Sequence, residues 1–116
     1  MREKIKDKGR LEHILNSINI LLENKDKRSF EEVINDPILF YGFVKHVEII
    51  GEAVYMLTKE FRETHPEVEW EVIEGMRHVL VHGYYKIKPI QLWNTIENDI
   101  PELKPLIEKY YRECSD

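Results

Sequence analysis

Apolar residues recur at intervals of three and four positions through most of this 116-residue chain. One set predicts an amphipathic helix over residues 9–24 and a second predicts a long central helix from residue 37 to about residue 58, because each set lies on one helical face. No stretch alternates apolar and polar residues strongly enough to favour strands, although YYKIK at 84–88 could form a short one. The two sets are Leu11, Ile14, Leu15, Ile18, Leu21 and Leu22, and Phe40, Val44, Val47, Ile50, Val54 and Leu57.

Two helix starts are marked by capping residues. Ser29 and Glu32 have the spacing of a capping box, which predicts a short helix after the first connector. Asp36 precedes Pro37, and this order suits an N-cap followed by the first helical position. We expect the central helix to begin at this pair.

Small residues and helix breakers organise the second half of the chain. A break at Pro66 precedes a helix that opens at Trp70 and ends near Gly83. Within the central helix, Gly51 and Ala53 are suited to a position where another helix approaches closely.

Prolines also mark the last helical stretch. It restarts at Lys88-Pro89, and we expect Pro101 and Pro105 to kink or divide it. The resulting expectation is an all-α bundle of four or five helices, in one domain that spans residues 1–116.

Composition narrows the function classes. The charged start and the shortness of the apolar runs predict a cytoplasmic protein without a signal peptide or membrane span. Cys114 is the one cysteine, so no disulfide framework or cysteine-ligated metal is expected. The formal net charge of −5 opposes nucleic-acid binding unless a basic surface is local. Lys45 and His46 could extend such a surface, but we expect them on a solvated face.

The segment MRHVLVHGYY at 76–85 gathers the candidate functional residues. Arg77 and His82 are five residues apart, which on a continuous helix means a rotation of about 140° and a rise of about 7.5 Å. A long arginine side chain and a helix end at Gly83 could bring them together, and so could a second copy across a two-fold axis. Guanidinium and imidazole groups are what metal-free RNA cleavage requires.

The same residues could also have purely structural roles. Arg77 and Lys86 could be solvated charges, His82 could bind the last carbonyls of its helix, and Tyr84 and Tyr85 could be packing residues with hydrated hydroxyls.

A metal face is a further alternative. Glu74, His78 and His82 follow one another at four-residue steps, as in a face with two histidines and one carboxylate, although the HExxH order is missing.

The spacing of Arg77, His82 and Tyr84 resembles the R-x4-H-x-Y signature of HepT-like toxins, a branch of the HEPN superfamily of ribonucleases. The resemblance covers nearly the whole chain. It extends to VEIIGEA at 47–53, HPEVEW at 65–70, GMR at 75–77, LVHGYY at 80–85 and LWNTIENDIPEL at 92–103.

The resemblance implies a dimeric HEPN-type bundle that acts as a metal-independent endoribonuclease toxin, with no cofactor. Arg77 would steady the scissile phosphate, His82 would be the acid or base, and Glu52 would support Arg77. The implied partner is a minimal nucleotidyltransferase antitoxin that can transfer AMP to Tyr84. His78 stands where relatives often carry asparagine.

A dimer would also reconcile the acidic net charge with RNA binding. Its cleft could be locally basic through paired Arg77, His82, Lys86 and Lys88 while the outer faces stay acidic. The alternative function is a catalytically silent helical module that serves as a scaffold for the nucleotidyltransferase.

Overall fold

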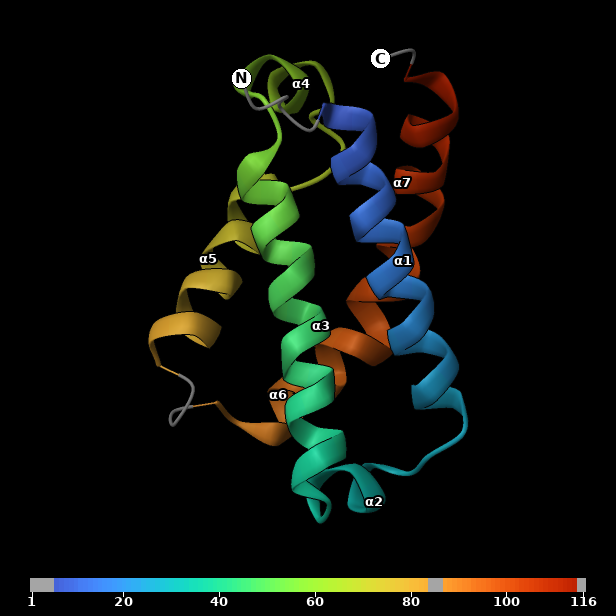
Figure 1. Ribbon diagram of the computed structural model, residues 1–116, viewed down its shortest axis with the longest axis vertical. Helices are drawn as coiled ribbons and strands as arrows, with labels where there is room; N and C mark the ends of the chain where they lie inside the picture. The colour runs from blue at the N-terminus through green and yellow to red at the C-terminus, as the bar shows by residue number, and fades with distance from the viewer. Residues whose placement is uncertain (1–5, 84–86, 115–116) are drawn as a thin grey trace, which may run out of the picture.

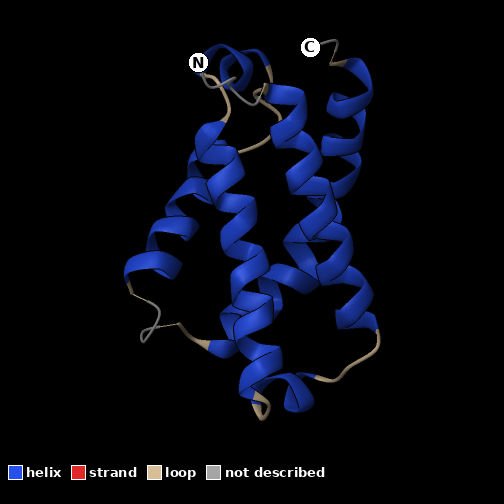
Figure 2. Ribbon diagram, viewed as in Figure 1, coloured by secondary structure: helices blue, strands red, loops and turns tan. Residues whose placement is uncertain are grey.

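The computed structural model describes residues 6–83 and 87–114, and these residues form helices and connecting turns with no strand (Figures 1 and 2). The all-α prediction is therefore confirmed for the described part of the chain. The helical segments are more numerous than the four or five expected, because short helices join the long ones. In chain order they are α1 (Asp7–Asp26), α2 (Phe30–Ile34), α3 (Pro37–Met56), α4 (Lys59–Thr64), α5 (Trp70–His82), α6 (Pro89–Asn94), a π-helical turn (Thr95–Asp99) and α7 (Ile100–Glu113).

Both predicted helix starts are present. The Ser29 hydroxyl accepts a hydrogen bond from the Glu32 backbone N–H, and the Ser29 backbone N–H donates to the Glu32 carboxylate, which completes the capping box. The Asp36 carboxylate accepts from the backbone N–H groups of Ile38 and Leu39 at 2.9 and 3.3 Å. These contacts satisfy donors that the first turn of a helix leaves unpaired.

The long helices form a layered bundle in which α3 lies between α1 and α5, and α1 lies between α3 and α7 (Figure 1). Their shared core is built from residues that are almost completely buried on α1, α3 and α7. Among the described residues, no helix combines the length and the apolarity needed to cross a bilayer. Because α3 lies between α1 and α5, helix α5 is at one flank of the bundle, with α3 as its main neighbour.

A short helix that the sequence analysis did not predict, α4, follows the central helix. The hydroxyl of Thr58 caps it by accepting from the backbone N–H of Phe61 at 3.1 Å. Asp7 of α1 in turn accepts from the backbone N–H and the hydroxyl of Thr58, at 2.9 and 2.8 Å. Because Asp7 is 51 residues away, no local pattern indicated this support.

The two prolines of the last helical stretch behave differently. Pro101 follows the π-helical turn, in which the backbone N–H of Ile100 donates to the carbonyl of Thr95. A proline has no N–H and its ring collides with the carbonyl four residues earlier, so a wider turn before Pro101 relieves the conflict. Pro105 was also expected to kink or divide the helix. It does not divide it, since α7 continues through Pro105 to Glu113.

The expectation that His46 lies on a solvated face was wrong. His46 is half-buried between α3 and α1, and its Nδ1 atom lies 3.2 Å from the hydroxyl of Ser17. This burial lowers the pKa of His46 below its ordinary value. Lys45 is exposed, as expected, and its Nζ atom lies 3.3 Å from Oε1 of Glu48.

Candidate active site

The start of α5 is anchored by a connected set of aromatic side chains. The indole N–H of Trp70 donates to the carbonyl of His65 at 2.8 Å. The His65 Nδ1 atom lies 2.8 Å from the carbonyl of Phe61, and the two rings stack with centroids 4.0 Å apart. The HPEVEW segment therefore fixes the corner between α4 and α5.

A second contact ties the same corner to the last helix. The buried Tyr110 of α7 donates its hydroxyl to the Glu67 carboxylate at 3.2 Å. Burial and the neighbouring Glu67 charge raise the pKa of Tyr110 to about 12. The backbone N–H of Glu67 and the Tyr110 hydroxyl lower the pKa of Glu67. The corner is thus held by a charge-assisted hydrogen bond at neutral pH.

The predicted close approach between helices occurs at Gly51. A Cβ atom at this position would collide with the Cβ of Arg77 and would lie 3.2 Å from its Cα. Only glycine lets the α5 backbone come this near to α3. The glycine of the IGEA segment therefore positions the candidate phosphate-binding arginine.

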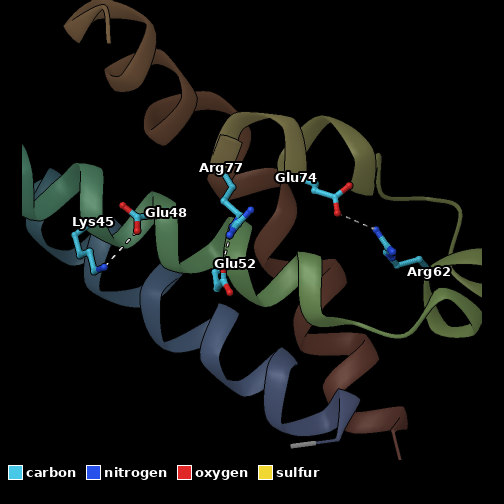
Figure 3. Close-up of polar contacts among 6 residues, drawn as sticks. All are labelled: Lys45, Glu48, Glu52, Arg62, Glu74 and Arg77. Carbon is cyan, nitrogen blue, oxygen red and sulfur yellow. Dashed lines mark hydrogen bonds and ion pairs between the residues drawn. The ribbon is translucent and has the colours of Figure 1, made fainter. Parts of the chain in front are cut away.

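Two further residues of α3 hold the Arg77 guanidinium: Glu52, which Figure 3 shows beside it, and Tyr55. Its Nε donates to the Glu52 carboxylate, which forms both a hydrogen bond and an ion pair. Its central carbon lies 4.9 Å from the ring centroid of Tyr55, within the range of a cation–π contact. The Arg77 side chain remains 24% exposed, so it is held at the surface without being enclosed.

The chemistry of this arrangement is that of an oriented surface cation. Neither Glu52 nor Tyr55 forms a hydrogen bond with the terminal nitrogens Nη1 and Nη2 of Arg77. These are the atoms with which a guanidinium binds phosphate oxygens in a bidentate way. Fixing the side chain beforehand reduces the entropy lost when an anion binds. Glu52 contacts Arg77 directly, and its role in supporting that arginine during a reaction stays a prediction.

His82 is the last residue of α5, so its backbone still follows the helix. The five-residue separation from Arg77 therefore keeps a rotation of about 140° and a rise of about 7.5 Å. The helix ends at Gly83, as expected, and the backbone N–H of Gly83 donates to the carbonyl of Val79 at 2.8 Å. Because His82 is still part of the helix, the helix end at Gly83 does not change the direction in which the His82 backbone points.

Several predicted site residues cannot be placed around Arg77. Tyr84, Tyr85 and Lys86 lie outside the described residues, as does the side chain of His82. His78 is an exposed residue of α5, one position after Arg77. What the structure brings together is Arg77, Glu52, Gly51 and Tyr55.

The carboxylate of the alternative metal face has another contact. Glu74 lies 3.7 Å from Nη1 of Arg62, and this ion pair connects α5 to α4 (Figure 3). Within the described residues, which do not include the side chain of His82, no group of three or more histidine, cysteine, aspartate or glutamate residues could hold a metal ion.

Tyr55 is the contact of this site that the sequence analysis missed. It lies three residues after Glu52 on α3, so both side chains reach the same side of the helix. An exposed aromatic residue at this spacing from the IGEA glutamate was the available signal. Its partner on α5 could be found only from the packing of the two helices.

The fold and the site define an all-helical protein that presents an arginine oriented by a carboxylate and an aromatic ring. The chain belongs to the HepT-like ribonuclease family. The family model, described as Ribonuclease HepT-like, matches residues 13–110. It is 46% identical over 99 residues to "Putative RNase TTE0752" of Caldanaerobacter subterraneus subsp. tengcongensis, covering 85% of this chain and 88% of that protein.

Other relatives of the chain are also named as ribonucleases. The chain is 36% identical over 101 residues to "Putative RNase MJ1380" of Methanocaldococcus jannaschii, covering 87% of this chain and 93% of that protein. It is 34% identical over 102 residues to "Probable ribonuclease HepT" of Thermococcus cleftensis, covering 88% of this chain and 93% of that protein. No solved structure matches the chain significantly.

Proposed function

We propose that this protein is a metal-independent endoribonuclease and acts as the toxin of a toxin–antitoxin pair. The observation that carries the proposal is the orientation of Arg77 by Gly51, Glu52 and Tyr55 in a chain that belongs to a ribonuclease family. A preorganised cation at the surface is suited to a reaction in which negative charge develops on phosphate oxygens.

The reaction is an internal transesterification of RNA. A base removes the proton of the 2′-hydroxyl, the 2′-oxygen attacks phosphorus, and the bond from phosphorus to the 5′-oxygen breaks. An acid gives a proton to that leaving oxygen, so the products carry a 2′,3′-cyclic phosphate and a 5′-hydroxyl. Arg77 stabilises the charged phosphorane, and His82 serves as acid or base.

A homodimer would supply two copies of each group to one cleft. On the outer side of α5, Val72 and Val79 are 64% and 52% exposed. Gly75 lies between them, and a Cβ atom there would meet nothing within 4 Å. A mid-helix glycine is unfavourable by about 1 kcal/mol relative to alanine, so a close crossing by a second copy would account for it.

The register of α5 relates this crossing to the site. Position 82 follows Gly75 by seven residues, about two turns, and so lies on the same side of the helix axis. Two copies that cross at Gly75 with their α5 helices roughly parallel would therefore bring their His82 positions toward each other. This arrangement addresses the angular separation of Arg77 and His82 within one chain.

The proposal includes a minimal nucleotidyltransferase as antitoxin. Its support is the R-x4-H-x-Y spacing, which places Tyr84 two residues after His82. AMP on Tyr84 would bring a negative charge near Arg77 and compete with the RNA phosphate. The modified tyrosine would also obstruct access to the site.

A cleavage assay with purified protein tests the nuclease proposal. Single-stranded RNA is incubated with the protein in EDTA, and the product ends are identified by mass spectrometry. We expect 2′,3′-cyclic phosphate ends, and we expect Arg77→Ala and His82→Ala to remove cleavage while the circular dichroism spectrum is kept.

The opposite outcomes are equally specific. Cleavage that disappears in EDTA and returns with a divalent ion would favour the Glu74, His78 and His82 alternative. A folded dimer that leaves RNA intact under all conditions would favour the silent scaffold. Unfolding of either alanine variant would show that the replaced residue is structural.

A further inference from the structure

One face of α3 carries a continuous row of exposed or partly exposed side chains that runs away from Arg77. Tyr41, Lys45, Glu48, Glu52 and Tyr55 follow each other at steps of three and four residues, which keeps them on one side of the helix. We refer to these five residues as the α3 stripe. Its ends are about 21 Å apart, given the rise of a helix over 14 residues.

A pocket opens beside the middle of the α3 stripe, between α1 and α3. Its volume is about 270 Å³, and Ile49 and Ala53 provide its apolar surface. Arg10 and His13 of α1 line one side, and three members of the α3 stripe (Lys45, Glu48 and Glu52) line the other. The pocket therefore shares Glu52 with the Arg77 site.

Within the described residues, the cations of this pocket are incompletely neutralised. Nε of Arg10 is buried and has no hydrogen-bond partner among the described residues. Glu52 is engaged by Arg77, and Glu48 by Lys45 at 3.3 Å. A buried guanidinium nitrogen without a partner is unfavourable until an acceptor arrives.

The α3 stripe also offers a stacking surface. Tyr41 is 52% exposed, although its ring edge contacts Phe40 with centroids 5.2 Å apart. Single-stranded nucleic acids bind where cations follow the backbone and aromatic rings accept bases. Arg77, Arg10, Lys45 and Tyr41 provide that combination along one face of an acidic protein.

We propose that single-stranded RNA follows the α3 stripe away from the Arg77 site, with a phosphate in the pocket between Arg10 and Lys45 and a base stacked on Tyr41. This proposal rests on the proposed ribonuclease function and extends it to substrate binding beyond the scissile phosphate. Glu48 competes with the RNA phosphate for Lys45, so it limits affinity.

The test measures binding and cleavage separately. Binding is measured by fluorescence anisotropy with a labelled single-stranded 2′-O-methyl oligoribonucleotide, which has no free 2′-hydroxyl to attack and stays intact. Cleavage is measured on unmodified RNA of the same sequence. Arg10→Gln keeps most of the buried side-chain stem, so its effect reports on the charge.

Five variants of the pocket and the α3 stripe should respond differently. Arg10→Gln and Lys45→Ala should each weaken binding about fivefold and lower the salt slope by about 0.7. Tyr41→Ala should weaken binding without changing the slope, and Tyr41→Phe should restore it. Glu48→Gln should strengthen binding.

Matched controls come from the far end of α1, where Lys27 and Glu23 form an exposed ion pair at 3.2 Å. Lys27→Ala and Glu23→Gln make the same charge changes and should leave binding within twofold of the parent, about the size of a surface effect.

Each outcome decides between the two proposals. Cleavage of RNA together with parent-like binding by Arg10→Gln, Lys45→Ala and Tyr41→Ala would overturn the RNA path and leave the ribonuclease function intact. Binding that depends on these residues without any cleavage would overturn the ribonuclease function and keep the RNA surface. If Lys27→Ala weakens RNA binding as much as Lys45→Ala does, affinity depends only on net charge. This result would also overturn the proposed RNA path.

Discussion

Gly51 of α3 lies directly against Arg77 of α5, so close that any side chain at position 51 would meet the Arg77 backbone and Cβ. The neighbouring Glu52 binds the guanidinium of the same arginine. Two consecutive residues of one helix therefore determine where Arg77 lies and how it points. Substitutions at these two positions should separate the placement of Arg77 from its orientation.

Gly51→Ala should disturb the site and the fold together. The added methyl lies 3.2 Å from the Cα of Arg77, so α5 must move away from α3. We expect a loss of about 1–3 kcal/mol in the free energy of unfolding, measured with urea, and a loss of RNA cleavage. Gly42→Ala is the control in the same helix, since its Cβ would meet nothing within 4 Å. It should keep activity and gain up to about 1 kcal/mol; equal behaviour of the two variants would contradict the close approach.

Glu52→Gln should lower cleavage more than stability. Glu52 is half exposed, so loss of its charge should change the free energy of unfolding by less than about 1 kcal/mol. The guanidinium of Arg77 becomes less well oriented, and kcat should fall more than KM rises. Glu74→Gln removes another ion pair of α5, with Arg62, and should leave kcat unchanged. A matching fall in both variants would assign the effect to the position of α5.

Gly75→Leu should separate the proposed dimer into folded monomers. The position is open within one chain, so the larger side chain disturbs only a crossing with a second copy. Sedimentation should show twice the chain mass for the parent and the single mass for the variant. Gly42→Leu introduces the same side chain at another open position and should stay dimeric. A monomeric parent, or a dimeric Gly75→Leu variant, would argue against the crossing.

The protein should lose stability as pH falls because of His46. Burial lowers the pKa of His46 from its ordinary value of 6.5, so the unfolded chain binds its proton first. The contribution is complete above pH 6.5 and is lost as pH decreases through that value toward the lower folded pKa. Urea unfolding at several pH values should show a smaller pH dependence for His46→Gln. His13→Gln, at an exposed position of α1, should keep the dependence of the parent.

AMP should be attached to Tyr84 and should stop cleavage. Incubation with ATP, magnesium and the proposed nucleotidyltransferase partner should add one AMP group, because the tyrosine of the R-x4-H-x-Y spacing is the expected acceptor. Tyr84→Phe should resist modification and remain active, whereas Tyr85→Phe should be modified and silenced. Mass spectrometry that places AMP on Tyr85, or full activity after complete modification of Tyr84, would argue for inhibition by occlusion.

Local chemistry explains which helical features were predictable. The Asp36-Pro37 pair and the Ser29–Glu32 box involve contacts between residues two or three positions apart. Such contacts form in any chain with these residues, so α2 and α3 begin where the sequence indicates. The motif around Arg77 likewise identified the family from the sequence, and the family comparison confirmed it.

The contacts that orient the candidate site depend on residues far apart in the chain. The sequence indicated Gly51 as a site of close helix approach and Glu52 as a support for Arg77. The contact between Tyr55 and Arg77 forms only because α5 packs against α3. Likewise, His46 is half-buried against Ser17, which lies 29 residues earlier in the chain. The sequence by itself determined the helical periods, the caps and the family motif, because each is encoded within a few turns. Only the tertiary structure decided which side chains surround Arg77, because helix packing brings together residues that no local spacing relates.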